Sequence, residues 1–192
     1  MSAGVVVGDD GLRRCPWGIS TPDYLAYHDT EWGRPIHDDS ALFERLTLEA
    51  FQSGLSWLTI LRKRESFRRA FASFDIAAVA SFDEADRARL MADAGIVRNR
   101  AKVDAALANA RAALALDEPL ADLMWRFAPD TRPAPRTTAD VPAQTAESQA
   151  LARALKAHRF VFVGPVTGYA LMQAVGMVDD HLSDCSFRVA TA

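Results

Sequence analysis

The chain has 192 residues, of which 49% are hydrophobic and 24% charged, and its formal net charge is -3. This composition is typical of an ordinary soluble globular protein, and the length suits one domain or two small lobes that share a core. No apolar run is long enough to cross a membrane, and the small net charge neither supports nor excludes nucleic-acid binding, because the distribution of charge matters more than its total.

Residues 1–13 are predicted to be a short disordered lead-in of a cytoplasmic protein. Their few apolar residues precede their charges, which is not the order found in a signal peptide. A single helical domain of two lobes is expected over 14–187, followed by a flexible tail over 188–192.

The first long predicted helix begins at Asp39 and ends before Gly54. One side of it carries residues spaced four, three and four apart, namely Leu42, Leu46, Glu49 and Ser53. Glu49 therefore points with the leucines, while Glu44 and Arg45 are expected to face water. A buried carboxylate without a partner is costly, so Glu49 needs either a buried partner or a function.

Helical periodicity predicts a second helix from Trp57 and further helices over 75–80, 83–93, 99–115, 119–127, 146–158 and 167–176. Four prolines mark the stretch 129–144 as a linker or surface loop. No alternating pattern of useful length predicts a strand. The fold class is therefore all-α, and the proline-rich loop is compatible with a two-lobed arrangement.

Basic residues concentrate between positions 62 and 102, where ten Arg or Lys stand against six Asp or Glu. They form either the solvated faces of helices or a surface that binds phosphates. Charge alone favours the first interpretation.

Two cysteines and two histidines are candidates for a metal site that joins the ends of the chain: Cys15, His28, His181 and Cys185. His181 and Cys185 are four residues apart, which would place them on one face of a helical turn. Two thiolates and two imidazoles are usual ligands of structural zinc. Alternatively, both cysteines are ordinary buried residues and the histidines are unrelated, and spacing alone leaves both interpretations open. A catalytic zinc, with Glu49 as general base, would need an open coordination position, and four protein ligands leave none.

Aromatic residues are dense in the N-terminal third of the chain, where they include Trp17, Tyr24, Tyr27, Trp32 and Trp57. Core packing explains any one of them taken alone. Together with a buried carboxylate they also fit the recognition of a flipped-out nucleobase, which stacks on aromatic rings and forms hydrogen bonds through its edge. A carboxylate in such a site accepts hydrogen bonds from an exocyclic amine and favours a base that carries positive charge.

Four long segments, in order over residues 14–185, carry a family resemblance: RCPWGISTPDYLAYHDTEWGRP, LEAFQSGLSWLTILRKRESFRRAF, DAGIVRNRAKV and FVFVGPVTGYALMQAVGMVDDHLSDC. They closely resemble the bacterial 3-methyladenine DNA glycosylase I family. The resemblance implies a helix-hairpin-helix glycosylase fold, in which two helical lobes flank a DNA-binding cleft. It also implies a structural zinc ion that is bound by two cysteines and two histidines, Cys15, His28, His181 and Cys185.

The same resemblance implies roles for particular side chains. The base-pocket glutamate of the family falls on Glu49. The pocket aromatics fall on Tyr27 and Trp57, with Trp17 and Tyr24 close by. The loop that enters the gap left by a flipped nucleotide falls on a segment that includes Gln52, Gly54 and Leu55.

The hairpin implied by the resemblance covers residues 162–168. Gly164 and Gly168 would let the backbone approach a phosphate closely, and amides around Thr167 would donate hydrogen bonds to it. Related enzymes that also cut the DNA backbone carry a nucleophilic lysine near this turn. Because no lysine lies over 160–176, a monofunctional enzyme that leaves an abasic site is expected.

Asp179 has two interpretations. Many members of the superfamily place a catalytic aspartate at this point, where the 3-methyladenine family often has asparagine, so Asp179 is a candidate to stabilise positive charge on the sugar. The alternative, which we favour, is that Asp179 or Asp180 caps a helix that presents His181 or supports that ligand as a hydrogen-bond acceptor.

We therefore expect a base-excision repair glycosylase that acts as a monomer on alkylated double-stranded DNA. It would hydrolyse the N-glycosidic bond of 3-methyladenine and contain structural zinc. Phosphates are expected to be met by the hairpin amides and by some of Arg62, Lys63, Arg64, Arg98, Arg100 and Lys102. The alternative is a non-catalytic, zinc-stapled helical DNA-binding protein, which would have no use for a carboxylate on an apolar face among aromatic rings.

Overall fold

The computed structural model of the protein describes residues 4–130 and 132–189. In these residues the chain is mostly helical. Its α-helices are α1 (Pro22–Thr30), α2 (Asp39–Gln52), α3 (Trp57–Ala70), α4 (Ile76–Ala80), α5 (Glu84–Ala92), α6 (Arg100–Leu114), α7 (Leu120–Trp125), α8 (Ala146–Ala157) and α9 (Pro165–Ala174). Short 3-10 helices are η1 (Pro16–Ile19), η2 (Ala72–Phe74) and η3 (Thr138–Asp140). The strands are β1 (Val6–Val7) and β2 (Arg13–Arg14).

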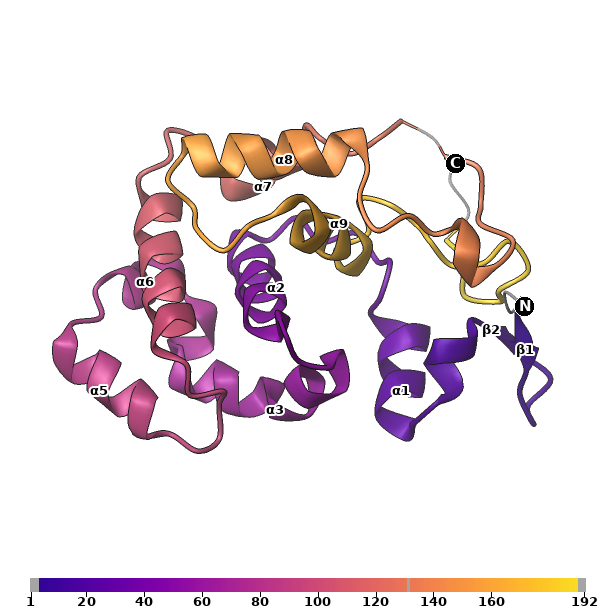
Figure 1. Cartoon of the computed structure of the whole chain (residues 1–192), viewed down its shortest axis with the longest axis horizontal. Helices are drawn as coiled ribbons and strands as arrows, with labels where there is room; N and C mark the ends of the chain where they lie inside the picture. The colour runs from indigo at the N-terminus through magenta and orange to yellow at the C-terminus, as the bar shows by residue number, and fades with distance from the viewer. Residues whose placement is uncertain (1–3, 131, 190–192) are drawn as a thin grey trace.

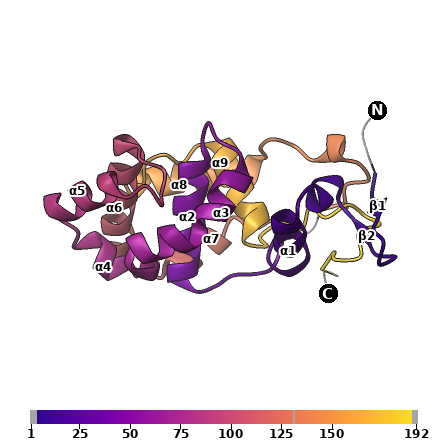
Figure 2. The same ribbon diagram turned by 90° about the horizontal axis from the view of Figure 1, so that it is seen from below.

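The molecule is elongated, as Figure 1 shows. Helices α2 and α9 lie in the middle, α5 and α6 lie towards one end, and α1 lies towards the other end with both strands (Figures 1 and 2). The segment after α9 returns to the strand end in both views, where the amide of Arg13 donates to the Ser186 hydroxyl at 3.0 Å. Among the helices of the described residues, none combines the length and apolar character needed to span a membrane.

The predicted helices form close to their expected bounds, but the strands were not expected. Strand β1 pairs with β2 in antiparallel register, with Val6 opposite Arg14. This hairpin occupies part of the segment predicted to be a disordered lead-in over 1–13. Arg14 holds it, because its guanidinium donates to Asp10 at 2.6 and 2.8 Å and to Asp29 at 3.0 and 3.1 Å. The prediction of disorder is therefore not met over the described part of this segment, and residues 1–3 lie outside the described chain.

The predicted flexible tail is also tied down at its start. Arg188 donates to the carbonyl oxygens of Asp179 and His181 at 3.1 and 2.8 Å, and the amide of Val189 donates to the Asp179 carboxylate at 2.8 Å. Positions 190–192 of that prediction lie outside the described residues.

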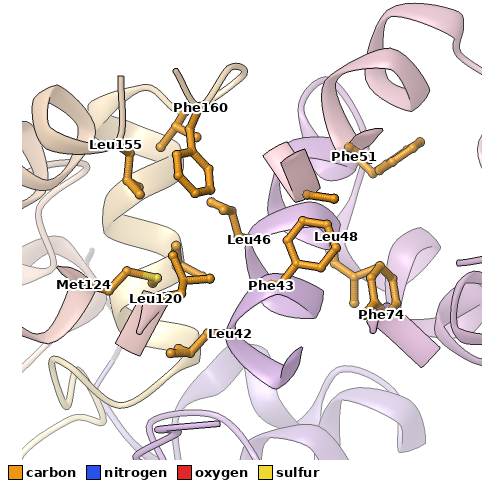
Figure 3. Close-up of a cluster of buried hydrophobic side chains, with 14 of the residues drawn as sticks. Leu42, Phe43, Leu46, Leu48, Phe51, Phe74, Leu120, Met124, Leu155 and Phe160 are labelled. Carbon is orange, nitrogen blue, oxygen red and sulfur yellow. The ribbon is translucent and has the colours of Figure 1, made fainter. Parts of the chain in front are cut away.

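Helix α2 is the centre of the core. Its N-terminus is capped by Asp38, which accepts a hydrogen bond from the amide of Ala41 at 2.8 Å. Every residue over 42–51 is buried, because α3, α6, α7 and α9 all pack around the helix. Figure 3 shows Leu42 and Leu46 directed to one side of α2, and Phe43, Leu48 and Phe51 directed to the other.

The prediction that Glu44 and Arg45 face water was wrong. Both side chains are buried, and each is paired with an opposite charge from another element. Glu44 accepts from Arg68 at 2.8 Å, and Arg45 donates to Glu31 at 2.6 Å. A helix surrounded on all sides has no water-facing stripe, so its charged residues must be paired.

A second, smaller hydrophobic cluster joins the chain ends. It consists of Cys15, Leu182 and Cys185, with Val5, Trp17 and Phe187 packed against it. The division of residues 14–187 into two lobes remains a prediction.

Candidate functional site

A cavity of about 390 Å³ opens where α1 and η1 face the end of α2, the start of α3 and helix α9. This volume is within the range of small-molecule sites. Its lining residues are Cys15, Trp17, Tyr24, Tyr27, Trp32, Glu49, Gln52, Trp57, Thr138, Val141, Ala170, Gln173, Asp180 and Leu182. The structure therefore brings together Glu49 and all four aromatic residues predicted to surround it.

Glu49 is the unusual charge in this cavity. Its side chain is directed inward from the last full turn of α2, and the residue is only 5% exposed. Burial raises the pKa of Glu49 to about 8, and the only opposing influence is the positive charge of Arg45. Within the described chain no hydrogen bond contributes to that pKa, so the carboxyl oxygens are free to accept bonds from a ligand.

Arg45 does not neutralise Glu49 by direct pairing. Its Nη2 donates to Glu31 at 2.6 Å, and Glu31 accepts two further hydrogen bonds from Arg64 at 2.6 and 2.8 Å. The Arg45 guanidinium also lies 5.8 Å from the centre of the Tyr27 ring. Glu31 thus holds Arg45 against the Tyr27 ring and leaves Glu49 without a direct ion pair to it.

The aromatic rings form a continuous wall. The Tyr27 and Trp57 ring centres are 5.5 Å apart at 48°, and Trp17 meets Tyr24 and Trp32 edge to face at 5.6 and 4.9 Å. The Tyr24 hydroxyl accepts from the amide of Leu58 at 3.0 Å, which fixes that ring against the start of α3. The Trp57 Nε1 is buried without a hydrogen-bond partner among the described residues.

The α2–α3 loop, residues 53–56, follows directly after the cavity wall. Gly54 adopts a left-handed backbone with φ of 79°, and the amide of Leu55 donates to the carbonyl of Gln52 at 2.7 Å. Leu55 is 40% exposed, and Gln52 lines the cavity. Gln52 thus lines the cavity, and Gly54 and Leu55 follow it in the adjoining loop.

The α8–α9 turn, residues 158–164, contains the start of the predicted hairpin. Gly164 precedes the first turn of α9, and Thr167 lies within that turn. The amide of Gly168 bonds to the carbonyl of Gly164 at 2.7 Å, so it is not itself a donor for a phosphate, and the proximity of Gly168 to DNA stays a prediction. A Cβ on Gly168 would lie 3.3 Å from the Ser148 carbonyl oxygen, so this glycine instead permits close packing of α9 on α8.

Three of the four predicted metal ligands converge. The sulfurs of Cys15 and Cys185 and a ring nitrogen of His28 all lie within 4.8 Å of one another, and His28 Nε2 is 3.6 Å from the Cys185 sulfur. The centre of the His181 ring lies 4.8 Å from that of the His28 ring. The ring nitrogens of His181 are not within 4.8 Å of all three of the other ligand atoms. The segment that carries His181 and Cys185 is a series of turns, so the prediction of one helical turn was wrong.

Each histidine is oriented by a carboxylate. Asp29 lies 2.7 Å from Nδ1 of His28, and Asp179 lies 2.7 Å from Nδ1 of His181. Histidines that bind metals through Nε2 usually have such a partner on the other nitrogen. The hydrogen bond with the Cys15 thiol lowers the pKa of Cys185 despite burial, which favours a thiolate at this position. These donors fit a structural zinc ion.

Asp179 is therefore placed at the Cys/His cluster, and it does not line the cavity. Besides the His181 ring, it accepts from the amides of His181 and Val189 at 3.0 and 2.8 Å. This geometry supports the interpretation of Asp179 as an orienting acceptor and gives no support to a catalytic role. Asp180 instead faces the cavity, where it accepts from Tyr169 and, at 2.8 Å, from Gln173.

Comparison with known proteins identifies the family. The family model for methyladenine glycosylases matches residues 17–189. The chain belongs to this family. It is 45% identical over 183 residues to the DNA-3-methyladenine glycosylase of Haemophilus influenzae, which covers 92% of this chain and 98% of the relative. It is also 45% identical over 180 residues to DNA-3-methyladenine glycosylase 1 of Escherichia coli, with 91% and 96% covered.

Solved structures agree with this membership. A crystal structure of 3-methyladenine DNA glycosylase I (TAG) superposes with a TM-score of 0.86 at 44% identity, covering 90% of this chain and 98% of that chain. A structure that addresses 3-methyladenine recognition by the Staphylococcus aureus enzyme superposes with a TM-score of 0.87 at 34% identity, covering 93% and 98%.

In this methyladenine glycosylase, most of the basic residues predicted to meet phosphates are already bound within the protein. Lys102 and Lys63 donate to backbone carbonyls, Arg62 pairs with Asp23 at 2.8 Å, and Arg64 pairs with Glu31. The remaining two, Arg98 and Arg100, are exposed just before and at the start of α6.

Sequence reasoning missed part of the glycosylase pocket. Trp32 was counted among the dense aromatics but was given no role, and it lines the cavity. Gln173 comes from α9, and Thr138 and Val141 come from the proline-rich loop. No local pattern marks these residues, because the fold alone brings α9 and that loop to the cavity.

Proposed function

We propose that this glycosylase hydrolyses the N-glycosidic bond of 3-methyladenine in alkylated double-stranded DNA, as an enzyme of base excision repair. The observation that carries the proposal is the Glu49 carboxyl, which is enclosed, has no hydrogen-bond partner over residues 4–130 and 132–189, and lies beside a cavity walled by indole and phenol rings. The names of the two curated relatives state the same activity.

The chemistry of this substrate suits such a pocket. A 3-methylated adenine in DNA is already cationic, so its glycosidic bond is weakened and the base departs neutral without being protonated. The protein must then extrude the nucleotide and hold the base while water attacks C1′. The tasks of the pocket are stacking, selection and exclusion of bulk water.

Glu49 supplies the selection. Because burial raises its pKa to about 8, ionising this carboxyl is unfavourable near neutral pH without a nearby cation. A cationic base stabilises the carboxylate, whereas neutral adenine does not. Tyr27 and Trp57 pack against the ring, and the unpartnered Trp57 Nε1 offers one hydrogen bond to it.

Leu55 is proposed to fill the gap left by the extruded nucleotide, with Gln52 beside it. Apolar side chains commonly take this role in distorted DNA. The amides at the start of α9, around Gly164 and Thr167, are proposed to hold a phosphate, as helix N-termini do. The enzyme is proposed to act as a monomer in the cytoplasm, through the helical region over 14–187.

The enzyme is also proposed to be monofunctional. The chain has three lysines, Lys63, Lys102 and Lys156, and none of them lines the cavity. A lyase step needs an amine that attacks the sugar. Without such an amine in the cavity, the product of this enzyme would be an intact strand with an abasic site. Borohydride should trap no covalent complex with alkylated DNA, and strand scission should require alkali. A trapped complex would contradict this part of the proposal.

The Cys/His cluster is proposed to hold structural zinc through Cys15, His28, His181 and Cys185. With four protein ligands the ion supplies no open position for chemistry and serves to fix the fold. Asp29 and Asp179 would orient the two imidazoles, and the cluster would tie the N-terminal segment to the C-terminal segment.

The decisive experiment measures release of free 3-methyladenine from methylated duplex DNA, with unmodified DNA as the control. We expect release by the parental protein and a loss of at least roughly a hundredfold in Glu49→Gln, which keeps the shape of the side chain but removes its charge, since electrostatic groups in catalysis commonly contribute that much. Binding of Glu49→Gln to an abasic-site duplex should persist. A parental protein that binds DNA but releases no base would favour the alternative, a zinc-stapled DNA-binding protein.

A further inference from the structure

Two buried polar side chains on helix α6 hold the two loops that the proposed function brings to DNA. Lys102 is 8% exposed and Asn109 is 1% exposed. They are seven residues apart, which places them on the same face of the helix, about 10 Å apart along its axis. One reaches the α2–α3 loop, and the other reaches the α8–α9 turn.

Lys102 closes the C-terminal end of α2. Its Nζ donates to the carbonyl oxygens of Phe51 and Ser53 at 2.8 and 2.5 Å. The last carbonyls of a helix have no partner within the helix and carry its negative dipole, so a buried ammonium group there is doubly favourable. Gly54 and Leu55 follow immediately, and the position of Leu55 therefore depends on this cap.

Asn109 holds a strained turn. Its side-chain amide accepts from the Val161 amide at 2.8 Å and donates to the Val161 carbonyl at 3.1 Å. The residues Arg159 and Phe162 on either side have positive φ values of 68° and 59°. Such conformations persist only where the surroundings fix them, and Asn109 supplies two of the bonds that fix this one.

We propose that Lys102 and Asn109 are positioning residues that set the spacing between the α2–α3 loop and the α8–α9 turn, so that both engage one DNA duplex during base extrusion. The proposal rests on the proposed function for the DNA step. It assigns α6 the role of a brace, which touches neither the base nor the cavity.

Helix α6 also provides a matched control. Arg111 donates to the carbonyl oxygens of Ala80 and Phe82 at 3.0 and 2.8 Å, and so caps α4 as Lys102 caps α2. Neither of its acceptors lines the cavity or belongs to the two loops. Arg111→Met therefore removes the same kind of contact without loosening a proposed DNA-binding element.

The first measurement is hydrogen exchange of the protein without DNA. Lys102→Met keeps the length of the side chain, and Asn109→Leu keeps its shape. We expect exchange to accelerate roughly tenfold over 53–56 in Lys102→Met and over 159–164 in Asn109→Leu, as loss of such bonds predicts. Arg111→Met should change neither segment, and Lys102→Arg, which keeps a donor, should recover part of the protection.

The second measurement separates base binding from DNA engagement. Lys102→Met should bind free 3-methyladenine with parental affinity, yet lose excision from duplex DNA by roughly tenfold. Its loss on the same alkylated sequence as a single strand should be smaller, because no paired stack has to be opened. Asn109→Leu should weaken binding to undamaged duplex. Rescue of duplex excision by Lys102→Arg would distinguish positioning from a general loss of stability.

The proposed role of α6 would be overturned if both loops exchanged at the parental rate in Lys102→Met and Asn109→Leu. It would also be overturned if Lys102→Met lost free-base binding and duplex excision to the same extent. An equal effect of Arg111→Met would overturn it as well. Failure of the proposed function looks different, because the parental protein itself would then release no 3-methyladenine, while the exchange measurements would still decide whether α6 holds the loops.

Discussion

At the scale of single residues, Glu49 is costly to the fold. Its folded pKa of about 8 lies above the usual value of 4.5, so the native state binds more protons than the unfolded state between these two pH values. The contribution of Glu49 to the free energy of unfolding must therefore fall as pH rises from about 4.5 to 8. Each pKa unit corresponds to about 1.4 kcal/mol, so this one carboxyl costs a few kcal/mol at pH 8.

Glu49→Gln should consequently be more stable than the parental protein, and increasingly so at higher pH. We expect little difference at pH 4.5 and a gain of roughly 3–5 kcal/mol by pH 8, measured as the free energy of unfolding in urea across this range. Glu44→Gln is the matched control on the same helix. Because it breaks an ion pair with Arg68, it should lose stability. A gain in Glu49→Gln that did not vary with pH would contradict the argument.

The sequence predicted the inward direction of Glu49 because helical spacing relates neighbours along one segment. The same reasoning failed for Glu44 and Arg45, because their partners come from elsewhere in the chain: Arg68 from α3 and Glu31 from the turn after α1. Charged residues are usually exposed, and only the packing of several elements around α2 reverses that expectation. Local pattern therefore found the functional carboxyl but not the buried ion pairs around it.

At the scale of elements, helix ends were predictable because their caps are local. Asp38, Ser56, Asn99 and Thr145 each accept a hydrogen bond from an amide in the following turn. The short hairpin of β1 and β2 was not predictable from alternation, because two-residue strands have too little of it. Its stability comes from Arg14, which reaches Asp29 on α1.

Two glycines with positive φ provide a test of how elements are joined. Gly176 ends α9 with φ of 75°, and a Cβ there would lie 2.5 Å from backbone atoms of Arg34 and Pro35, in the segment between α1 and α2. Gly54 has φ of 79°, and a Cβ there would meet nothing within 4 Å. The two glycines have the same left-handed backbone conformation, but only Gly176 is closely approached by another part of the backbone.

Gly54→Ala should cost about 1–2 kcal/mol, which is the price of a left-handed alanine. Gly176→Ala should cost that amount plus roughly 1–3 kcal/mol, because rigid backbone must move to accept the added methyl group. Urea unfolding of the two variants beside the parental protein measures both values. Equal losses would mean that the contact between α9 and the segment before α2 yields easily.

At the scale of the whole molecule, the sequence predicted four ligands, Cys15, His28, His181 and Cys185, of which the first two and the last converge within 4.8 Å. It did not predict how this cluster is connected to the pocket. That connection runs through α1, where Tyr27 faces the cavity and the next residue, His28, faces the cluster. A single helix thus relates the proposed metal site to the base wall. The ends of the chain meet there, although 170 positions separate Cys15 from Cys185.

Removing the proposed zinc should therefore loosen the chain ends and the pocket together. A chelator should lower the melting temperature and the affinity for free 3-methyladenine in parallel, and Cys185→Ser should reproduce both effects with metal content reduced on the same sample. Asp29→Asn should lower metal affinity by about 10–100-fold while leaving every ligand in place. Excess zinc should then restore its metal content but only part of its melting temperature, because Asp29 also pairs with Arg14. If chelation abolished excision with the melting temperature and base affinity unchanged, the metal would belong to the chemistry, because a purely structural ion cannot be lost without loosening the fold that it holds.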